Sequence, residues 1–315
     1  MNKEIISPTA VGTGLICLDA IEIPADSHYK LFTGGTCINV LVILQSYGWN
    51  IVPIGRIGDD PAAESIFRDL EFLGVDTRFI RRDRNDFTPI YIETFSTEGH
   101  RFLHRCPRCQ TKFADFQPVA MADILFILPE LPDKIDVCFI DRVSQASLTL
   151  AEYCKEHGAL IYFEPNRPED ISLFEQCLQI TNVVKYSAEK MASAKEMTDR
   201  LHIPLEIETH GKKGLYYRTD DGRRKSEWRH MPAIPCHAFV DAAGSGDWLS
   251  SHLIHQLMGD TNNQRNTVCF DAIEFILRTA QKIASSNCGQ EGARGSMYHT
   301  ADIQIGAGFC PYCGY

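Results

Sequence analysis

Short apolar stretches alternate with helical patterns along the chain from about residue 120. Runs rich in β-branched and aromatic residues occupy 124–128, 137–140, 159–163 and 205–209. Between them, the spacing of apolar residues predicts helices over 144–157, 169–179 and 187–200. Short runs that are apolar throughout are typical of strands buried on both faces. The alternation therefore predicts a parallel sheet with helices on both sides.

An earlier segment, "DDPAAESIFRDLEFLG", predicts a helix with both of its ends marked. Asp60 suits the N-cap, Pro61 the first helical position, and Gly74 the stop. The apolar residues between them fall on one stripe, namely Ile66, Phe67, Leu70 and Leu73. The apolar run 51–55 precedes this helix and adds a further strand-helix unit.

Two other segments alternate differently and predict hairpins. Residues 15–32 and 89–104 each contain two short strands, with polar turns at 24–27 and 96–99. Two arrangements satisfy this pattern. The hairpins form a small antiparallel sheet of their own, or they are edge hairpins of the main sheet.

Composition and charge exclude several classes of protein. Of 315 residues, 44% are apolar and 23% are charged, which is ordinary for a globular protein. Lys and Arg number 31 against 41 Asp and Glu, so the formal charge is −10, the wrong sign for a main partner that is nucleic acid or an anionic membrane. Since no stretch has the pattern of a signal peptide or a membrane span, we expect a cytoplasmic protein.

The stretch "VDAAGSGDWLSSHLIHQL" carries the first candidate chemistry. Small residues from Ala242 to Gly246 lie between Asp241 and Asp247, directly before an amphipathic helix. Unpaired amides and the positive end of a helix bind anions where small side chains permit close approach. Asp247 would then lie beside a phosphate site as a base for a substrate hydroxyl. The alternative is an ordinary glycine-rich loop in which Asp247 only begins the helix.

"DAAGSGD" resembles the C-terminal signature of the ribokinase-like PfkB carbohydrate kinases. "GGTCINVLVILQSYGWNIVPIGRIGDD" at 34–60 resembles the N-terminal signature of that family. "FEPNRP", "VVKYSAEK" and "ETHGKKGLYY" resemble three of its intervening segments, in the expected order. The resemblance implies one ribokinase-like domain over 1–315: a three-layer α/β/α sandwich with a mostly parallel central sheet, and a small antiparallel lid from about 14–34 and 88–105. It also implies transfer of the γ-phosphate of ATP, with Mg²⁺, to a hydroxyl of a small sugar.

The resemblance assigns roles to individual residues. Asp247 corresponds to the catalytic base, with the amides of Ala243, Gly244, Ser245 and Gly246 as the anion hole. The residues implied for sugar binding are Asp19, Gly34, Gly35, Asn39 and Arg167. Those implied around the nucleotide are Thr209, Gly211, Gly214 and, for ordering Mg²⁺ and its waters, Glu189.

The chain departs from the family pattern at several positions. Ala242 replaces a usual Thr or Ser, Tyr186 a usual Asn, and Trp248 a small residue. Glu164 stands where Asp is common and Pro168 where the family has an arginine. Because of these departures, a catalytically weak homologue that binds sugar as a regulator stays open as an alternative. A nucleoside kinase of the same fold stays open as well, because its signatures overlap with those of the sugar kinases.

Two C-P-x-C motifs lie outside the resemblance. Cys106 and Cys109 form the first, and Cys310 and Cys313 form the second near the C-terminus. Two such turns can supply the four thiolates of a structural zinc site, which would attach the tail at 306–315 to the lid. Unconnected reduced thiols and a disulfide or redox role are the other interpretations. Because exposed strand edges invite pairing, the lid also suggests a homodimer.

Overall fold

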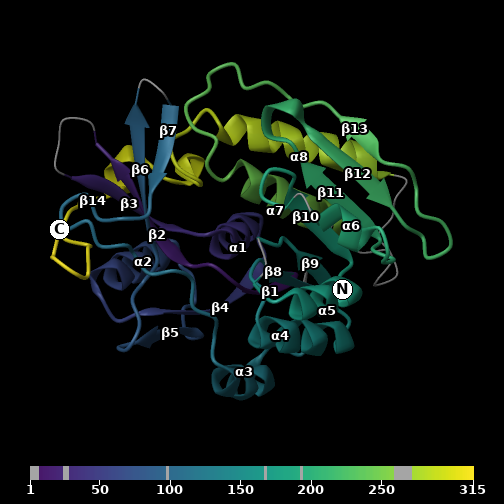
Figure 1. Cartoon of the computed structure of the whole chain (residues 1–315), viewed down its shortest axis with the longest axis horizontal. Coiled ribbons are helices and arrows are strands. Elements are labelled where there is room, and N and C mark those ends of the chain that lie inside the picture. Colours follow the sequence, from purple (N-terminus) through teal and green to yellow (C-terminus); the bar gives the residue numbers. More distant parts are fainter. Residues whose placement is uncertain (1–6, 24–27, 97–98, 167–168, 192–193, 259–271) are drawn as a thin grey trace, which may run out of the picture.

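The computed structural model describes residues 7–23, 28–96, 99–166, 169–191, 194–258 and 272–315. These residues form two sheets and the helices that cover them (Figure 1). No helix in these ranges is long and apolar enough to cross a bilayer.

The larger sheet has nine strands. Their spatial order is β13 (Arg229–Met231), β12 (Leu215–Thr219), β11 (Leu205–Thr209), β10 (Val183–Ser187), β9 (Leu160–Phe163), β8 (Val137–Ile140), β1 (Thr9–Thr13), β4 (Asn50–Gly58) and β5 (Ile80–Asp83). All pairs from β11 to β5 are parallel, whereas β12 and β13 are antiparallel additions at one edge. The central strands β8 and β9 are buried along their whole length, which explains their continuous apolar sequences.

Helices cover both faces of this sheet (Figure 1). One face packs against α1 (Thr36–Ser46), α7 (Ser245–Met258) and α8 (Ile273–Asn287). The other packs against α3 (Met121–Ile127), α4 (Gln145–Glu156), α5 (Ile171–Ile180) and α6 (Ala194–Thr198). The expected sandwich with a mostly parallel central sheet is confirmed.

The smaller sheet is separate from the larger one. Its order is β14 (Gln304–Gly306), β3 (Tyr29–Gly34), β2 (Cys17–Glu22), β6 (Ile90–Ser96) and β7 (Gly99–Leu103). Both predicted hairpins are present and join through a parallel β2–β6 pair, while the other pairs are antiparallel. Of the two arrangements expected, the separate small sheet is confirmed, and the hairpins are not at an edge of the main sheet. Residues 24–27 and 97–98 of the turns lie outside the described residues.

A third apolar core lies behind the smaller sheet. Helix α2 (Pro61–Phe72) packs there, together with parts of α1 and the C-terminal residues. Its predicted ends are correct: the Asp60 carboxylate accepts the Ala63 N–H at 2.9 Å, and Gly74 adopts a φ of +68°. The C-terminus lies beside this sheet, next to α2 (Figure 1).

Two predictions of secondary structure were wrong. Residues 124–128 belong mainly to α3 rather than to a strand, because only Ile124 and Ile127 are buried while Leu125 and Phe126 face solvent. A spacing of three between buried positions fits a helix, and a continuous apolar run alone does not distinguish the two. Within the predicted helix 187–200, the described helical part is only α6.

Candidate active site

The glycine-rich turn before α7 closes against the loop that follows α8. The Asp241 carboxylate accepts the N–H groups of Ala243 and Gly292, each at 2.9 Å, and so joins the two loops. Gly244 has a φ of +70°, and a Cβ there would lie 2.3 Å from the carbonyl oxygen of Ala293. Only glycine fits this conformation and this approach of two backbones.

The N–H groups of this turn differ in their availability. The Ala243 N–H is engaged by Asp241, and the Ser245 N–H donates to the carbonyl three residues before it. Within the described residues, the N–H groups of Gly244 and Gly246 donate to no acceptor. They lie at the N-terminus of α7, where open amides and the helix dipole favour an anion. Two of the four expected amides are thus open to a phosphoryl group.

Asp247 lies in the first turn of α7 beside these amides. Its side chain is 8% exposed, and its Oδ2 accepts a hydrogen bond of 2.8 Å from Nδ2 of Asn39 in α1. Burial raises the pKa of the Asp247 carboxyl to about 7, and the charge of Glu164 adds to the rise. The hydrogen bond from Asn39 and the charge of Lys185 act in the opposite direction. A carboxyl group tuned near neutrality suits a general base.

A buried ion pair lies on the other side of the glycine turn. Lys185 in β10 is 2% exposed and pairs with Glu164, which follows β9 and accepts the Ser250 hydroxyl at 2.7 Å. A Cβ on Gly246 would lie 3.3 Å from Nζ of Lys185, so the ammonium lies close under the turn. Lys185 was not among the site residues expected from the sequence. It could have been found from the strand "VVKYS", in which a lysine interrupts an otherwise apolar run. Lysine is rarely buried without a specific partner, so a lysine at such a position indicates a buried ion pair.

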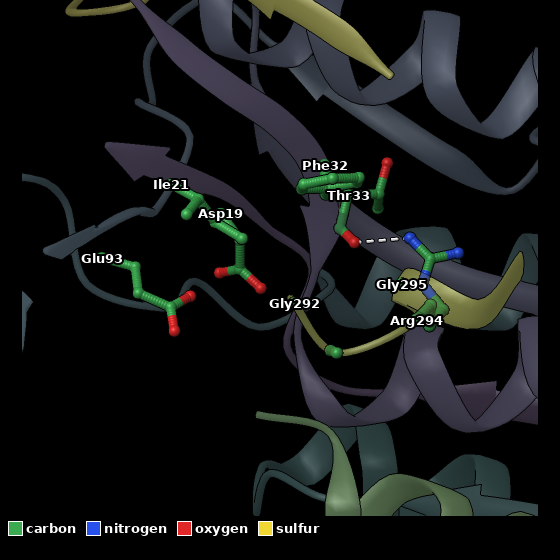
Figure 2. A pocket seen from close by; sticks show the side chains of 9 residues that line it. Asp19, Ile21, Phe32, Thr33, Glu93, Gly292, Arg294 and Gly295 are labelled. Carbon is green, nitrogen blue, oxygen red and sulfur yellow. Dashed lines mark hydrogen bonds between the residues drawn. The ribbon is translucent and has the colours of Figure 1, made fainter. Parts of the chain in front are cut away.

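A small pocket opens on the face of the smaller sheet that its apolar core does not cover (Figure 2). Asp19 in β2 and Glu93 in β6 line one side, and Gly292 and Arg294 line the other. A Cβ on Gly34 would lie 1.9 Å from a carboxylate oxygen of Asp19, so this glycine makes room for the acid. Of these four lining residues only Asp19 was expected from the sequence, and the expected Gly34 lies beside it; Glu93, Gly292 and Arg294 were not expected.

The acids of this pocket titrate unusually. Burial raises the pKa of Asp19 to about 6. Glu93 is 2% exposed; burial, the charges of Asp241 and Asp19, and a hydrogen bond with Asp241 raise its pKa to about 9. At neutral pH Glu93 therefore carries a proton, so it can donate a hydrogen bond as well as accept one.

Arg294 stabilises the other side of the pocket. Its Nη2 donates to the carbonyl of Thr33 at 2.6 Å and to Asp69 in α2 at 3.2 Å. The Arg294 side chain is 1% exposed, and the Asp69 carboxylate also accepts the Tyr298 hydroxyl at 3.1 Å. Arg294 thus joins the loop after α8 to the smaller sheet.

The other residues expected to bind sugar lie at the start of α1. Gly35 is the N-cap with a φ of +105°, and a Cβ there would lie 2.2 Å from the carbonyl oxygen of Leu15. Asn39 points its amide at Asp247, while its Oδ1 is buried without a hydrogen-bond partner among the described residues. Arg167 lies outside the described residues.

The residues expected around the nucleotide gather beyond the carboxyl ends of β10 and β11. Thr209 ends β11, and its hydroxyl donates to the carbonyl of Tyr186 at 3.3 Å. Gly211 and Gly214 bound the short helical turn that follows, both at positive φ. Glu189 is exposed in the turn after β10. Ligands of open parallel sheets bind at such carboxyl ends, and β9 and β10 also supply Glu164 and Lys185 to this edge.

The large side chains that depart from the family pattern have packing partners in the core and the loops. The Trp248 ring packs edge to face on Tyr47, and its Nε1 donates to the carbonyl of Ala293 at 3.0 Å. Tyr186 is buried in the core beneath α5 and α6. Nδ2 of Asn287 donates to the carbonyl of Ala243 at 3.1 Å and further fixes the turn. These large side chains thus pack in the core and the loops rather than over Asp247.

The four cysteines of the C-P-x-C motifs come together away from this site. Cys106, Cys109, Cys310 and Cys313 place their sulfur atoms within 4.8 Å of one another. Cys106 and Cys310 belong to the apolar core behind the smaller sheet.

Comparison with known proteins supports a phosphotransferase. The family described as pfkB family carbohydrate kinase matches residues 11–300. The fructokinase of Escherichia coli is 26% identical over 243 residues, which cover 68% of this chain and 73% of the relative. The structure of a fructokinase with bound ATP from Xylella fastidiosa is similar with a TM-score of 0.71 and 17% identity, covering 91% of this chain and 94% of that one. The structure of an aminoimidazole riboside kinase from Salmonella enterica, complexed with aminoimidazole riboside and an ATP analogue, is similar with a TM-score of 0.66 and 19% identity, covering 93% of this chain and 97% of that one.

Proposed function

Since the chain belongs to the PfkB family of carbohydrate kinases, we propose that it transfers the γ-phosphate of ATP to a hydroxyl of a small neutral sugar, with Asp247 as the base. The observation that carries this proposal is the position of Asp247. Its buried carboxylate lies in the first turn of α7, beside the open amides of Gly244 and Gly246, and Asn39 fixes its orientation.

The transfer step needs positioning and charge stabilisation. Asp247 orients the sugar hydroxyl and accepts its proton as the oxygen attacks the γ-phosphorus. The amides of Gly244 and Gly246 donate to the phosphoryl oxygens, whose charge develops at the N-terminus of α7. Lys185, held under the turn by Glu164, adds a positive charge at the same place. ADP leaves as the P–O bond to the β-phosphate breaks.

The sugar would lie between the smaller sheet and Asp247. Asp19 accepts hydrogen bonds from sugar hydroxyls, and Glu93, which donates its proton to Asp241, can accept one as well. Nη2 of Arg294 is bonded to Thr33 and to Asp69, which balances the guanidinium charge, while Nη1 can donate to a sugar hydroxyl. The pocket therefore favours a neutral sugar over a sugar acid, because a substrate carboxylate would face the negative charge of Asp19.

The nucleotide would lie along the carboxyl ends of β10 and β11, with Thr209, Gly211 and Gly214 beside it. Bound Mg²⁺ would neutralise charge on the ATP phosphates. Glu189 fits the task of ordering that ion and its waters, because its carboxylate is exposed in the turn after β10. Glu164 fits less well, because Lys185 and Ser250 already engage it.

The experiment that tests this proposal is a substrate panel with ATP and Mg²⁺, read out by ADP release. We expect turnover with fructose or ribose, and much less with ketodeoxygluconate, whose carboxylate the pocket disfavours. A preference for adenosine would instead support a nucleoside kinase. Binding of a sugar in thermal shift without ADP release from any substrate would indicate a regulatory homologue and overturn the proposal.

A further inference from the structure

The two C-P-x-C motifs adopt the same backbone structure in distant parts of the chain. In each, the N–H of the first cysteine donates to the carbonyl five residues later, and the N–H four residues later donates back to the first cysteine's carbonyl. These bonds are Cys106 to Thr111 (3.0 Å), Gln110 to Cys106 (2.9 Å), Cys310 to Tyr315 (2.5 Å) and Gly314 to Cys310 (3.0 Å). The residue four positions on is left-handed in both, with φ of 61° at Gln110 and 68° at Gly314.

Gln110 in the first turn has an unfavourable backbone conformation. Among the described residues other than glycine, it alone has a positive φ. That conformation costs free energy for any residue with a Cβ, so surrounding interactions must hold it. The turn thus keeps its two thiols pointing to one place despite a local penalty.

The four sulfur atoms lie close enough together to bind one metal ion. The Sγ atoms of Cys106 and Cys313 lie 3.7 Å apart, and those of Cys109 and Cys310 lie 4.0 Å apart. Four thiolates at about 2.3 Å from a zinc ion are about 3.8 Å from one another. A disulfide requires about 2.05 Å, so these contacts are not disulfide bonds. We propose that Cys106, Cys109, Cys310 and Cys313 bind one structural Zn²⁺ that stiffens the smaller sheet from behind.

The site lies between the two ends of that sheet. The first motif follows β7 at one edge, and the second follows β14 at the other. Phe309, next to Cys310, packs edge to face on Tyr29 of β3 at 5.2 Å, and the C-terminal Tyr315 packs on the same ring at 6.1 Å. A zinc ion would therefore connect the two edges of the sheet through the C-terminal tail.

The opposite face of the sheet carries the pocket. Leu18 and Ala20 of β2 face the core that contains the cysteines, whereas Asp19 between them faces the pocket. Glu93 alternates with Ile92 of β6 in the same way. Loss of the ion would release the tail and loosen the strands that position Asp19 and Glu93. This consequence rests on the proposed function, whereas the metal site itself does not.

The primary test measures metal without any assay of activity. Protein purified without chelator should contain about one zinc ion per chain, bound by four deprotonated thiols. After exchange with Co²⁺, the visible spectrum should show the ligand-field and charge-transfer bands of tetrahedral cobalt thiolate. Substoichiometric zinc together with no such bands would overturn the proposal, as would a mass showing a disulfide within the cluster.

Cysteine variants assign the ligands. Cys109→Ser and Cys313→Ser alter the less buried ligands and should each lose zinc and the cobalt bands. Cys236→Ser, at a partly exposed cysteine outside the cluster, is the matched control and should retain both. Retention of one zinc ion by both ligand variants would overturn the assignment.

The effect on the sheet has its own readout. Removal of zinc should raise the KM for the accepted sugar several-fold, with a smaller change in the KM for ATP, and zinc should reverse it. Equal sugar KM with and without zinc would overturn the stiffening of the pocket. If no substrate of the panel is turned over, the proposed function fails, and the metal content and cobalt spectra still decide the site.

Discussion

Nδ2 of Asn39 donates to Oδ2 of Asp247 at 2.8 Å, across 208 residues of sequence. The contact joins α1, which follows β3 of the smaller sheet, to the first turn of α7, and so brings the two signature segments together in one site. Because the amide can only donate at this position, the bond stabilises the ionised form of the carboxyl group. Asn39 therefore positions the proposed base and tunes its pKa.

Replacing the proposed base should abolish most turnover. Asp247→Asn keeps the size of the side chain and removes the proton acceptor, so kcat should fall by about 10² to 10⁴-fold. Thermal unfolding should show an intact fold, because the change removes a buried charge. ADP release with the best substrate measures the effect, and near-normal phosphorylation by the variant would contradict the assignment.

The pH dependence should report the same carboxyl group. With a pKa of about 7, Asp247 is increasingly protonated below that pH and cannot accept a proton. The value of kcat/KM should therefore fall about tenfold per pH unit on the acid side, and level off above pH 7. The pH profile of kcat/KM for the accepted sugar tests this, and an acid limb near pH 4 would exclude Asp247 as the titrating base.

Removing the Asn39 hydrogen bond should move that acid limb. Asn39→Ala deprives the ionised carboxylate of a donor, so the pKa of Asp247 should rise and the limb should shift upward by about one pH unit. The matched control is Asn50→Ala, at an exposed position beginning β4. A reduced rate with an unmoved limb would mean that Asn39 acts on the sugar and not on the base.

Lys185 should matter for both rate and stability. Lys185→Met leaves Glu164 without its partner beside Asp247, so the pKa of the base should rise and kcat should fall. The unpaired acid should also destabilise the fold by about 3 kcal/mol. The exposed Lys190→Met, on the turn after the same strand, is the control.

A double variant separates the two roles of Lys185. Glu164→Gln combined with Lys185→Met removes the unpaired charge, so the melting temperature should recover while turnover stays low. Recovery of turnover along with stability would contradict a role for the Lys185 charge at the phosphoryl group.

The sequence predicted the parts of the site that are continuous along the chain. The turn before Asp247 and the helix after it are adjacent in sequence, so small residues and apolar periodicity were enough to place them. Helix α2 was predicted for the same reason, since Asp60, Pro61 and Gly74 act locally. The run at 124–128 was not predictable, because exposure of Leu125 and Phe126 depends on what α3 packs against.

The remaining site residues act through contacts that spacing does not encode. Glu93 acquires its protonated state only when β6 pairs with β2, which brings it to Asp19, and when the loop before α7 brings Asp241 to it. Arg294 reaches Asp69 across 225 residues. Of these residues only Lys185 could have been suspected from the sequence, because it is a charged residue within an apolar strand. Its partner Glu164 directly follows the neighbouring strand β9.

Glu93 provides a test of the pocket that needs no substrate. Its pKa of about 9 in the folded protein exceeds the ordinary value of 4.5, because burial and nearby carboxylates disfavour its charged form. Between these two values the folded state holds a proton that the unfolded state has lost. The stability from this proton is fully present below pH 4.5 and is lost progressively as the pH rises to about 9.

Glu93→Gln should remove the loss of stability with rising pH, because glutamine is neutral at every pH and has nearly the same shape as glutamic acid. The melting temperature of the variant relative to wild type should increase from pH 5 to pH 9, by a few degrees if about 1 kcal/mol is recovered. Glu156→Gln, at an exposed position in α4, should show no such trend. Thermal unfolding at a series of pH values measures the difference. A constant offset between variant and wild type would mean that Glu93 is ionised in the folded protein, and the pocket would then carry a further negative charge against any substrate.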